Sequence, residues 1–135
     1  MEFAIDFGGE PQDVAVTAWG IADPAGLTRL HTGLTSDPRY RAGLLILADY
    51  SGLDMSDLTD RDIERVAAAI AESDWESPPR AVAIVASNLP TFVPTRMMVA
   101  HLGGSLSHHR VFTSREAAVA WLREQRWPEP RRSMG

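Results

Sequence analysis

The residues best suited to chemistry follow an apolar run at 44–48. Asp49 and Ser51 come directly after that run, and Thr59 lies further along the chain. A serine or threonine hydroxyl is a nucleophile when a base activates it, and it is a phosphate acceptor for a kinase. Structural roles also fit, since Ser51-Gly52 is a typical turn pair after a strand and Asp49 suits hydrogen bonds from loop amides. The sequence favours these structural roles and leaves the chemical ones as alternatives.

Thr59 has two interpretations of its own. With Asp62 three residues later it matches a capping box, in which the threonine side chain accepts a hydrogen bond at a helix N-terminus. A phosphate there would meet free N–H groups, but Asp57, Asp60 and Asp62 would repel it. We expect Thr59 to be an N-cap and keep its phosphorylation as the alternative.

A serine hydrolase is the third functional class to weigh. It needs a nucleophile on a G-x-S-x-G turn, and neither Ser51 nor Ser87 has that context. Ser87, Asp49 and one of His108 or His109 would still converge if all lay at the carboxyl ends of parallel strands. Without the turn motif we predict no catalytic residue.

The histidines do not predict a metal site. His108 and His109 are adjacent, and neighbours on a strand point to opposite faces. His31 shares an apolar stripe with leucines and is expected to pack at the edge of the core. No metal ion or other cofactor is therefore expected.

The segment 88–98, "NLPTFVPTRMM", is the best candidate for a contact surface. It follows an apolar strand and combines two prolines with apolar side chains and Arg96. An arginine beside apolar side chains suits a protein interface or the binding of a carboxylate or phosphate. The alternative is that Phe92 and Met97 pack on the last helix while Arg96 pairs with an acidic neighbour.

Composition excludes several classes of function. The chain has 135 residues, a net charge of −5 and no cysteine, and all 13 of its basic residues are arginine. Thiol nucleophiles, Schiff-base lysines and the P-loop lysine are therefore excluded. The acidic balance argues against nucleic acid as a partner. No apolar run approaches the ~20 residues that span a bilayer, the start lacks a basic signal region, and we expect a cytoplasmic protein.

Hydrophobic periodicity predicts strands alternating with helices. Strands are expected at 2–7, 13–19, 44–49, 81–87 and 109–112. Helices are expected to begin at Asp23-Pro24 and at Thr59, and a third is expected from Thr91 or Pro94 to Leu102. The last helix is expected to begin with a capping box of Thr113 and Glu116. Its buried side would carry Ala117, Ala118, Trp121 and Leu122. The order predicts an α/β fold with a mixed five-stranded sheet, parallel except for an N-terminal antiparallel edge hairpin, and four helices.

This order and certain segments resemble the STAS domain superfamily. The segments are "LLILADYSG", "TDRDIERVAAAIA", "AVAIVAS", "RMM" at 96–98 and "VFTSREAAVAWL". The resemblance implies a SpoIIAA-like βα-superhelix and a non-catalytic role in bacterial regulation through protein contacts. In anti-sigma-factor antagonists of the superfamily a serine of an Asp-Ser-Ser-Gly motif is phosphorylated. Here Asp57 is followed by Leu58 and Thr59, so the resemblance leaves Thr59 as the nearest hydroxyl.

The sequence thus predicts one STAS-like domain at 1–125 and a flexible tail at 126–135. It is expected to be a binding or regulatory module, not an enzyme, acting as a homodimer or on another protein. A carrier of a small apolar or anionic molecule near Phe92 and Arg96 is the alternative. The residues predicted to contact a partner or ligand are Asp49, Ser51, Thr59, Asn88, Phe92, Arg96 and Met97.

Overall fold

The computed structural model describes residues 1–103 and 108–126. Within them the chain forms, in order, β1 (Glu2–Phe7), β2 (Val14–Ile21), α1 (Pro24–Thr35), β3 (Leu45–Asp54), α2 (Asp60–Asp74), β4 (Ala81–Val85), α3 (Leu89–His101), β5 (His108–Phe112) and α4 (Arg115–Arg126). The strands form a sheet in the order β1-β2-β3-β4-β5. β1 is antiparallel to β2, and the other neighbours are parallel. The predicted mixed sheet with four helices is confirmed.

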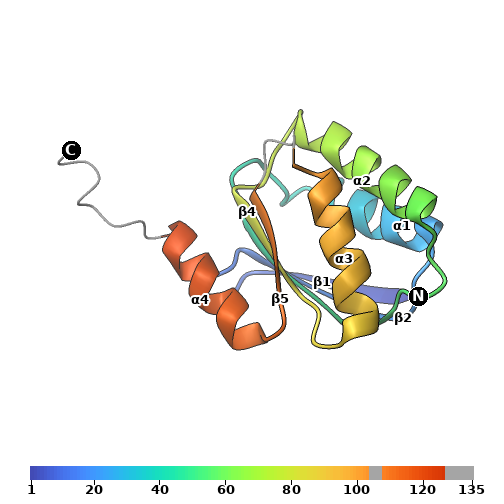
Figure 1. Cartoon of the computed structure of the whole chain (residues 1–135). Coiled ribbons are helices and arrows are strands. Elements are labelled where there is room, and N and C mark those ends of the chain that lie inside the picture. Colours follow the sequence, from blue (N-terminus) through green and yellow to red (C-terminus); the bar gives the residue numbers. More distant parts are fainter. Residues whose placement is uncertain (104–107, 127–135) are drawn as a thin grey trace.

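The helices cover the two faces of the sheet unequally. Figure 1 shows α1, α2 and α3 on one side of the strands and α4 on the other. The larger apolar cluster combines α1, α2 and α3 with side chains of β2, β3 and β4, such as Val16, Ile46 and Ile84. The smaller cluster joins α4 to the opposite side of β3 and β4. All of β4 is buried, as expected for a continuous apolar strand with helices on both faces.

Two helix starts follow the chemistry predicted for them. The Asp23 side chain accepts a hydrogen bond from Gly26 N at 2.6 Å, with a proline in the first helical turn. Thr59 Oγ1 accepts from Asp62 N at 3.1 Å, and the Asp62 carboxylate accepts from Thr59 N at 3.0 Å. The capping box is therefore confirmed.

The turn predicted at 51–52 is wrong. β3 continues to Asp54, and β2 stays paired beside it past a β-bulge between Thr17 and Trp19. A Cβ atom added to Gly52 would lie 3.0 Å from the Cβ of Trp19. The glycine thus allows two strands to approach closely, which is its other common use in a sheet.

The predicted start of α3 is also wrong. The helix begins at Leu89, before Thr91 and Pro94, because Asn88 caps it by accepting a hydrogen bond from Thr91 N at 3.0 Å. Pro90 lies in the first turn, where a helix does not need its N–H. The segment 88–98 is therefore helical from Leu89 onward.

The last helix differs from expectation at its first turn. Ser114, not Thr113, holds the capping position, since its hydroxyl accepts a hydrogen bond from Ala117 N at 3.2 Å. This start leaves Ala117 exposed, whereas Ala118, Trp121 and Leu122 are buried as predicted.

Arg126, which was assigned to the tail, is the last residue of α4. Its guanidinium donates to Asp13 Oδ1 at 2.6 Å and to the carbonyl of Pro11 at 2.8 Å. The end of α4 is thereby fastened to the turn between β1 and β2. The rest of the predicted tail lies outside the described residues.

Candidate functional site

Ser51, in the carboxyl-terminal half of β3, links this strand to the start of α3. Its hydroxyl accepts a hydrogen bond from Ser87 N at 3.2 Å, and its carbonyl accepts one from the Asn88 side chain at 3.1 Å. The Asp49 carboxylate accepts from Ser51 N at 2.9 Å. The structure therefore brings Asp49, Ser51 and Asn88 together, and the hydrogen bonds among them hold backbone groups.

His108 and His109 do not lie near the carboxyl ends of the strands, where Asp49 and Ser51 are. His108 pairs with Ala81 and His109 with Val82, whereas Asp49 pairs with Val85. Three residues along a strand span roughly 10 Å. Because the strands are parallel, the histidines lie near the amino ends and the serines at the carboxyl ends. The convergence of Ser87, Asp49 and a histidine is therefore wrong.

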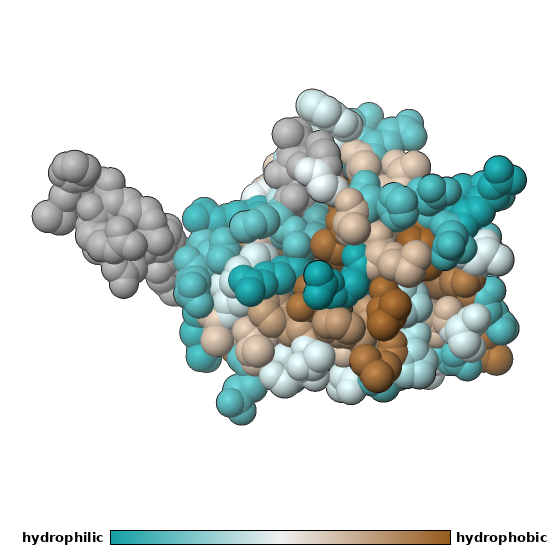
Figure 2. All heavy atoms as spheres, in the orientation of Figure 1, coloured by the Kyte–Doolittle hydropathy of each residue, from teal (hydrophilic) through white to brown (hydrophobic). Residues whose placement is uncertain are grey.

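The first turns of α3 expose large apolar side chains. Leu89 is 73% exposed and Val93 is 51% exposed. The exposed Arg96 places its guanidinium 5.9 Å from the ring centroid of the half-buried Phe92. Figure 2 shows hydrophobic atoms gathered over the amino-terminal part of α3. We call Leu89, Phe92, Val93 and Arg96 the α3 surface.

Met97 belongs to a different side of this helix. It is half-buried and packs against the larger apolar cluster. That cluster lies across the sheet from α4, so the alternative in which Met97 packs on the last helix is wrong. Thr59 also lies apart, in the exposed capping box at the start of α2.

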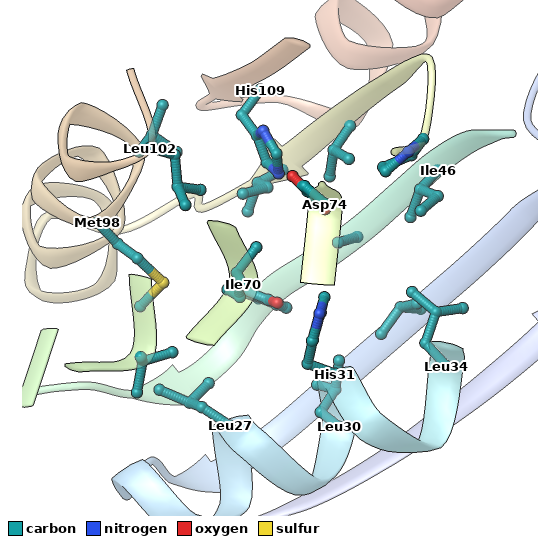
Figure 3. Close-up of a pocket in the computed structure, with 18 of the residues that line it drawn as sticks. Leu27, Leu30, His31, Leu34, Ile46, Ile70, Asp74, Met98, Leu102 and His109 are labelled. Atoms are coloured by element: carbon teal, nitrogen blue, oxygen red, sulfur yellow. The ribbon is translucent and has the colours of Figure 1, made fainter. Parts of the chain in front are cut away.

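A cavity of about 60 Å³ lies between the sheet and α1, α2 and α3. Most of its lining is apolar, including Leu27, Leu30, Ile46 and Met98. Five ionisable side chains also line it: His31, Tyr40, Tyr50, Asp74 and His109. In Figure 3, His31 rises from α1 toward the region where Asp74 and His109 lie together.

Burial shifts the pKa values of three side chains that line the cavity. Burial lowers the pKa of His31, Asp74 acts in the opposite direction, and His109 lowers it further. Burial raises the pKa of Tyr50 to about 12. Burial, and then the charge of Asp74, raise the pKa of Tyr40 to about 12, while its hydroxyl donates to the Ser77 carbonyl at 2.9 Å. Near neutral pH both tyrosines are therefore uncharged.

His31 also has an unsatisfied atom. Its Nε2 is buried, and no group among the described residues forms a hydrogen bond with it. Asp74, on the same cavity, is only 1% exposed. No group of three or more His, Cys, Asp or Glu side chains in the described ranges is arranged to hold a metal ion.

Sequence reasoning missed this cluster. It places His31 at the edge of the core and gives no role to Asp74, which is the last residue of α2. One signal was present: Asp74 continues the helical stripe of Ile63, Val66 and Ile70 at the next i+4 position. An acid at such a position points inward, but nothing in the sequence placed His31 or His109 beside it.

We expect His31 to make the protein less stable in weak acid. Because burial lowers its pKa below the ordinary 6.5, the unfolded chain binds this proton more readily than the folded protein. This contribution to stability is complete above the ordinary pKa and is lost as the pH falls toward the folded-state value. Urea unfolding of His31→Leu and the wild type between about pH 7.5 and 5.5 measures it.

The stability of His31→Leu relative to the wild type should rise as the pH falls through this range. The control is His101→Leu, at an exposed histidine at the end of α3. If the two variants and the wild type show the same pH dependence, His31 is not the group responsible. Asp74, His109 and Tyr40 share the cavity, so the result must be read as a difference between variants.

Comparison with known proteins identifies the fold. No family model matches the chain, and no curated protein matches it. A solved structure of an uncharacterized protein of the DUF3478 family from Shewanella loihica, described as having a SpoIIAA-like fold, is similar over 89% of this chain and 93% of that chain, with 20% identity and a TM-score of 0.55. Within the described ranges no helix has the length and apolar character needed to cross a bilayer. The chain has the SpoIIAA-like fold, which is the fold of STAS domains.

Proposed function

We propose that this protein is a non-catalytic binding module and that it contacts a protein partner through the α3 surface. The observation that supports this best is the exposure of Leu89 and Val93. They are four residues apart, so they lie on the same side of the helix. An apolar pair beside an arginine and an aromatic ring has the composition typical of the centre of an interface.

The neighbouring groups support binding more than catalysis. The Ser51 hydroxyl already accepts a hydrogen bond from the backbone N–H of Ser87. His108 and His109 lie near the amino ends of the parallel strands, away from Ser51. The segment 49–59 adjoins α3 through Ser51 and Asn88, so we include it in the contact region. A cysteine-free, acidic chain suits the cytoplasm, where we place this function.

The first partner to consider is a second copy of the chain. A two-fold dimer would set the α3 surface of one copy against the same surface of the other. Leu89 and Val93 would then be buried in both copies. The module would thus be a homodimer, or would use the same surface for another protein.

Val93→Asp is expected to raise the dissociation constant of this dimer by about tenfold or more, because a carboxylate would be buried in an apolar contact. Size-exclusion chromatography with light scattering over a range of protein concentrations measures the change. Val93 is a better site than the half-buried Phe92, because Phe92→Asp would also disturb packing.

The matched control is Ala69→Asp, an exposed position on α2. It adds the same charge at an exposed position of another helix, outside the α3 surface, and it should leave the dimer unchanged. A wild type that stays monomeric at every concentration would contradict the dimer, and equal weakening by both variants would contradict this surface.

A small-molecule carrier is the second candidate, and the cavity is the observation that favours it. The cavity is lined by Met98 and Val99 of α3 and by Leu102 just after it, and Phe92 and Arg96 are not among its lining residues. A ligand held in this cavity would therefore lie away from the predicted position beside Phe92 and Arg96.

A further inference from the structure

We propose that the cavity between α1, α2, α3 and the sheet binds a small, uncharged, mostly apolar molecule with one hydrogen-bonding group, which pairs with Nε2 of His31. This site is separate from the α3 surface, and it goes beyond the proposed protein contact. Either could therefore fail without the other.

The first support is the polar atom itself. Nε2 of His31 is buried without a hydrogen bond from the described residues. A buried polar atom without a partner is costly, and native proteins rarely leave one unmatched. Since His31 is one of the residues that line the cavity, a molecule inside the cavity is well placed to approach its imidazole and supply the missing hydrogen bond.

The second support is the size and apolar character of the cavity. One water molecule needs about 10–15 Å³ of such space, and this cavity has about 60 Å³. The room suits a molecule of a few non-hydrogen atoms. Around it lie Leu27, Leu30, Ile46 and Met98, which favour a hydrocarbon body over several waters.

The third support is charge. Asp74 is 1% exposed and lies on the same cavity, so a bound carboxylate would place two carboxyl groups in one poorly hydrated space. An ammonium group would be attracted by Asp74, but it would lose its water among leucine side chains, and the desolvation of a buried ion pair can exceed the gain from the attraction. A neutral hydroxyl avoids both costs, and it can either donate to or accept from an imidazole nitrogen.

Three probes with one carbon skeleton test this ligand class: isobutanol, isobutyrate and isobutylamine. They present a hydroxyl, an anion and a cation, respectively, on the same branched chain. Each is titrated into the full chain at neutral pH. NMR follows the imidazole nitrogens of His31 and the methyl groups of Ile46 and Met98, which lie on the cavity wall.

Isobutanol should produce saturable shifts at the His31 nitrogens and at both methyl-bearing residues. The two charged probes should bind at least tenfold more weakly. If isobutanol causes no saturable shift up to its solubility limit, the cavity holds water only and the proposal fails. Equal binding of isobutyrate would also overturn it, because the site would then not select an uncharged molecule.

Two substitutions at one position separate the polar contact from the space. His31→Leu should weaken isobutanol binding by about tenfold, the usual scale of one lost hydrogen bond. His31→Gln keeps a hydrogen-bonding group and should retain more of the affinity. Unchanged binding by His31→Leu would show that Nε2 holds nothing.

Filling the cavity gives a test that leaves His31 in place. Ala48 lines the cavity from β3, and Ala48→Val adds two methyl groups on a residue type that suits strands. This variant should lose the shifts at Ile46 and Met98 together with those at His31. Shifts at His31 that persist would place the probe elsewhere and overturn the assignment.

Discussion

Replacement of Leu122 by alanine is expected to lower the free energy of unfolding by about 2–5 kcal/mol. Leu122 is fully buried, and it belongs to the smaller cluster, in which α4 covers one side of β3 and β4. Truncation removes apolar contacts and leaves a space that the stiff central strands cannot fill. Urea denaturation followed by circular dichroism measures the loss.

The control for this variant is Leu89→Ala. Leu89 is 73% exposed, so the same truncation there should change stability by no more than about 0.5 kcal/mol. If both variants lose the same stability, α4 does not pack as described. A small loss in Leu89→Ala would also agree with the proposed function. It would show that folding does not depend on Leu89, which leaves this side chain available for contact with a partner.

Thr91→Val is expected to cost about 1–3 kcal/mol although the two side chains have nearly the same shape. Thr91 is fully buried, and its hydroxyl donates to the Leu53 carbonyl at 2.6 Å. Valine leaves that carbonyl without a partner. Thr95 extends the arrangement by donating to the Thr91 carbonyl at 2.7 Å.

Thr91→Ser is the matched variant, because it keeps the hydroxyl and removes only a methyl group. Its loss of stability should be smaller than that of Thr91→Val. These hydrogen bonds hold the start of α3 against the end of β3, so Thr91→Val should also weaken any dimer formed through the α3 surface. A valine variant as stable as the wild type would show that α3 is held by apolar packing alone.

The sheet and its helices were predictable because their signals are local. The apolar runs at 44–48 and 81–85 identified strands buried on both faces, and the capping residues Asp23 and Thr59 marked two helix starts. Side-chain periodicity and capping need only neighbouring residues. The similarity to the SpoIIAA-like fold rests on this same order of elements.

The errors arose where the answer depends on a distant part of the chain. Gly52 suggested a turn, but the backbone of β2 beside it keeps that segment in a strand. Thr91 or Pro94 was the predicted start of α3, but the Asn88 cap starts the helix earlier, and the buried Thr91 holds it against β3. His31, Asp74 and His109 come from three separate elements, so only folding brings them to one cavity.

The contacts of Arg126 have a consequence for folding kinetics. They join residues 113 and 115 positions apart, whereas each parallel strand pair closes over a single intervening helix. Contacts between residues that are far apart in the sequence carry the highest cost in chain entropy. We therefore expect the hydrogen bonds of Arg126 to form late, after the sheet has assembled. Removal of the Arg126 hydrogen bonds would then leave the folding rate nearly unchanged and raise the unfolding rate.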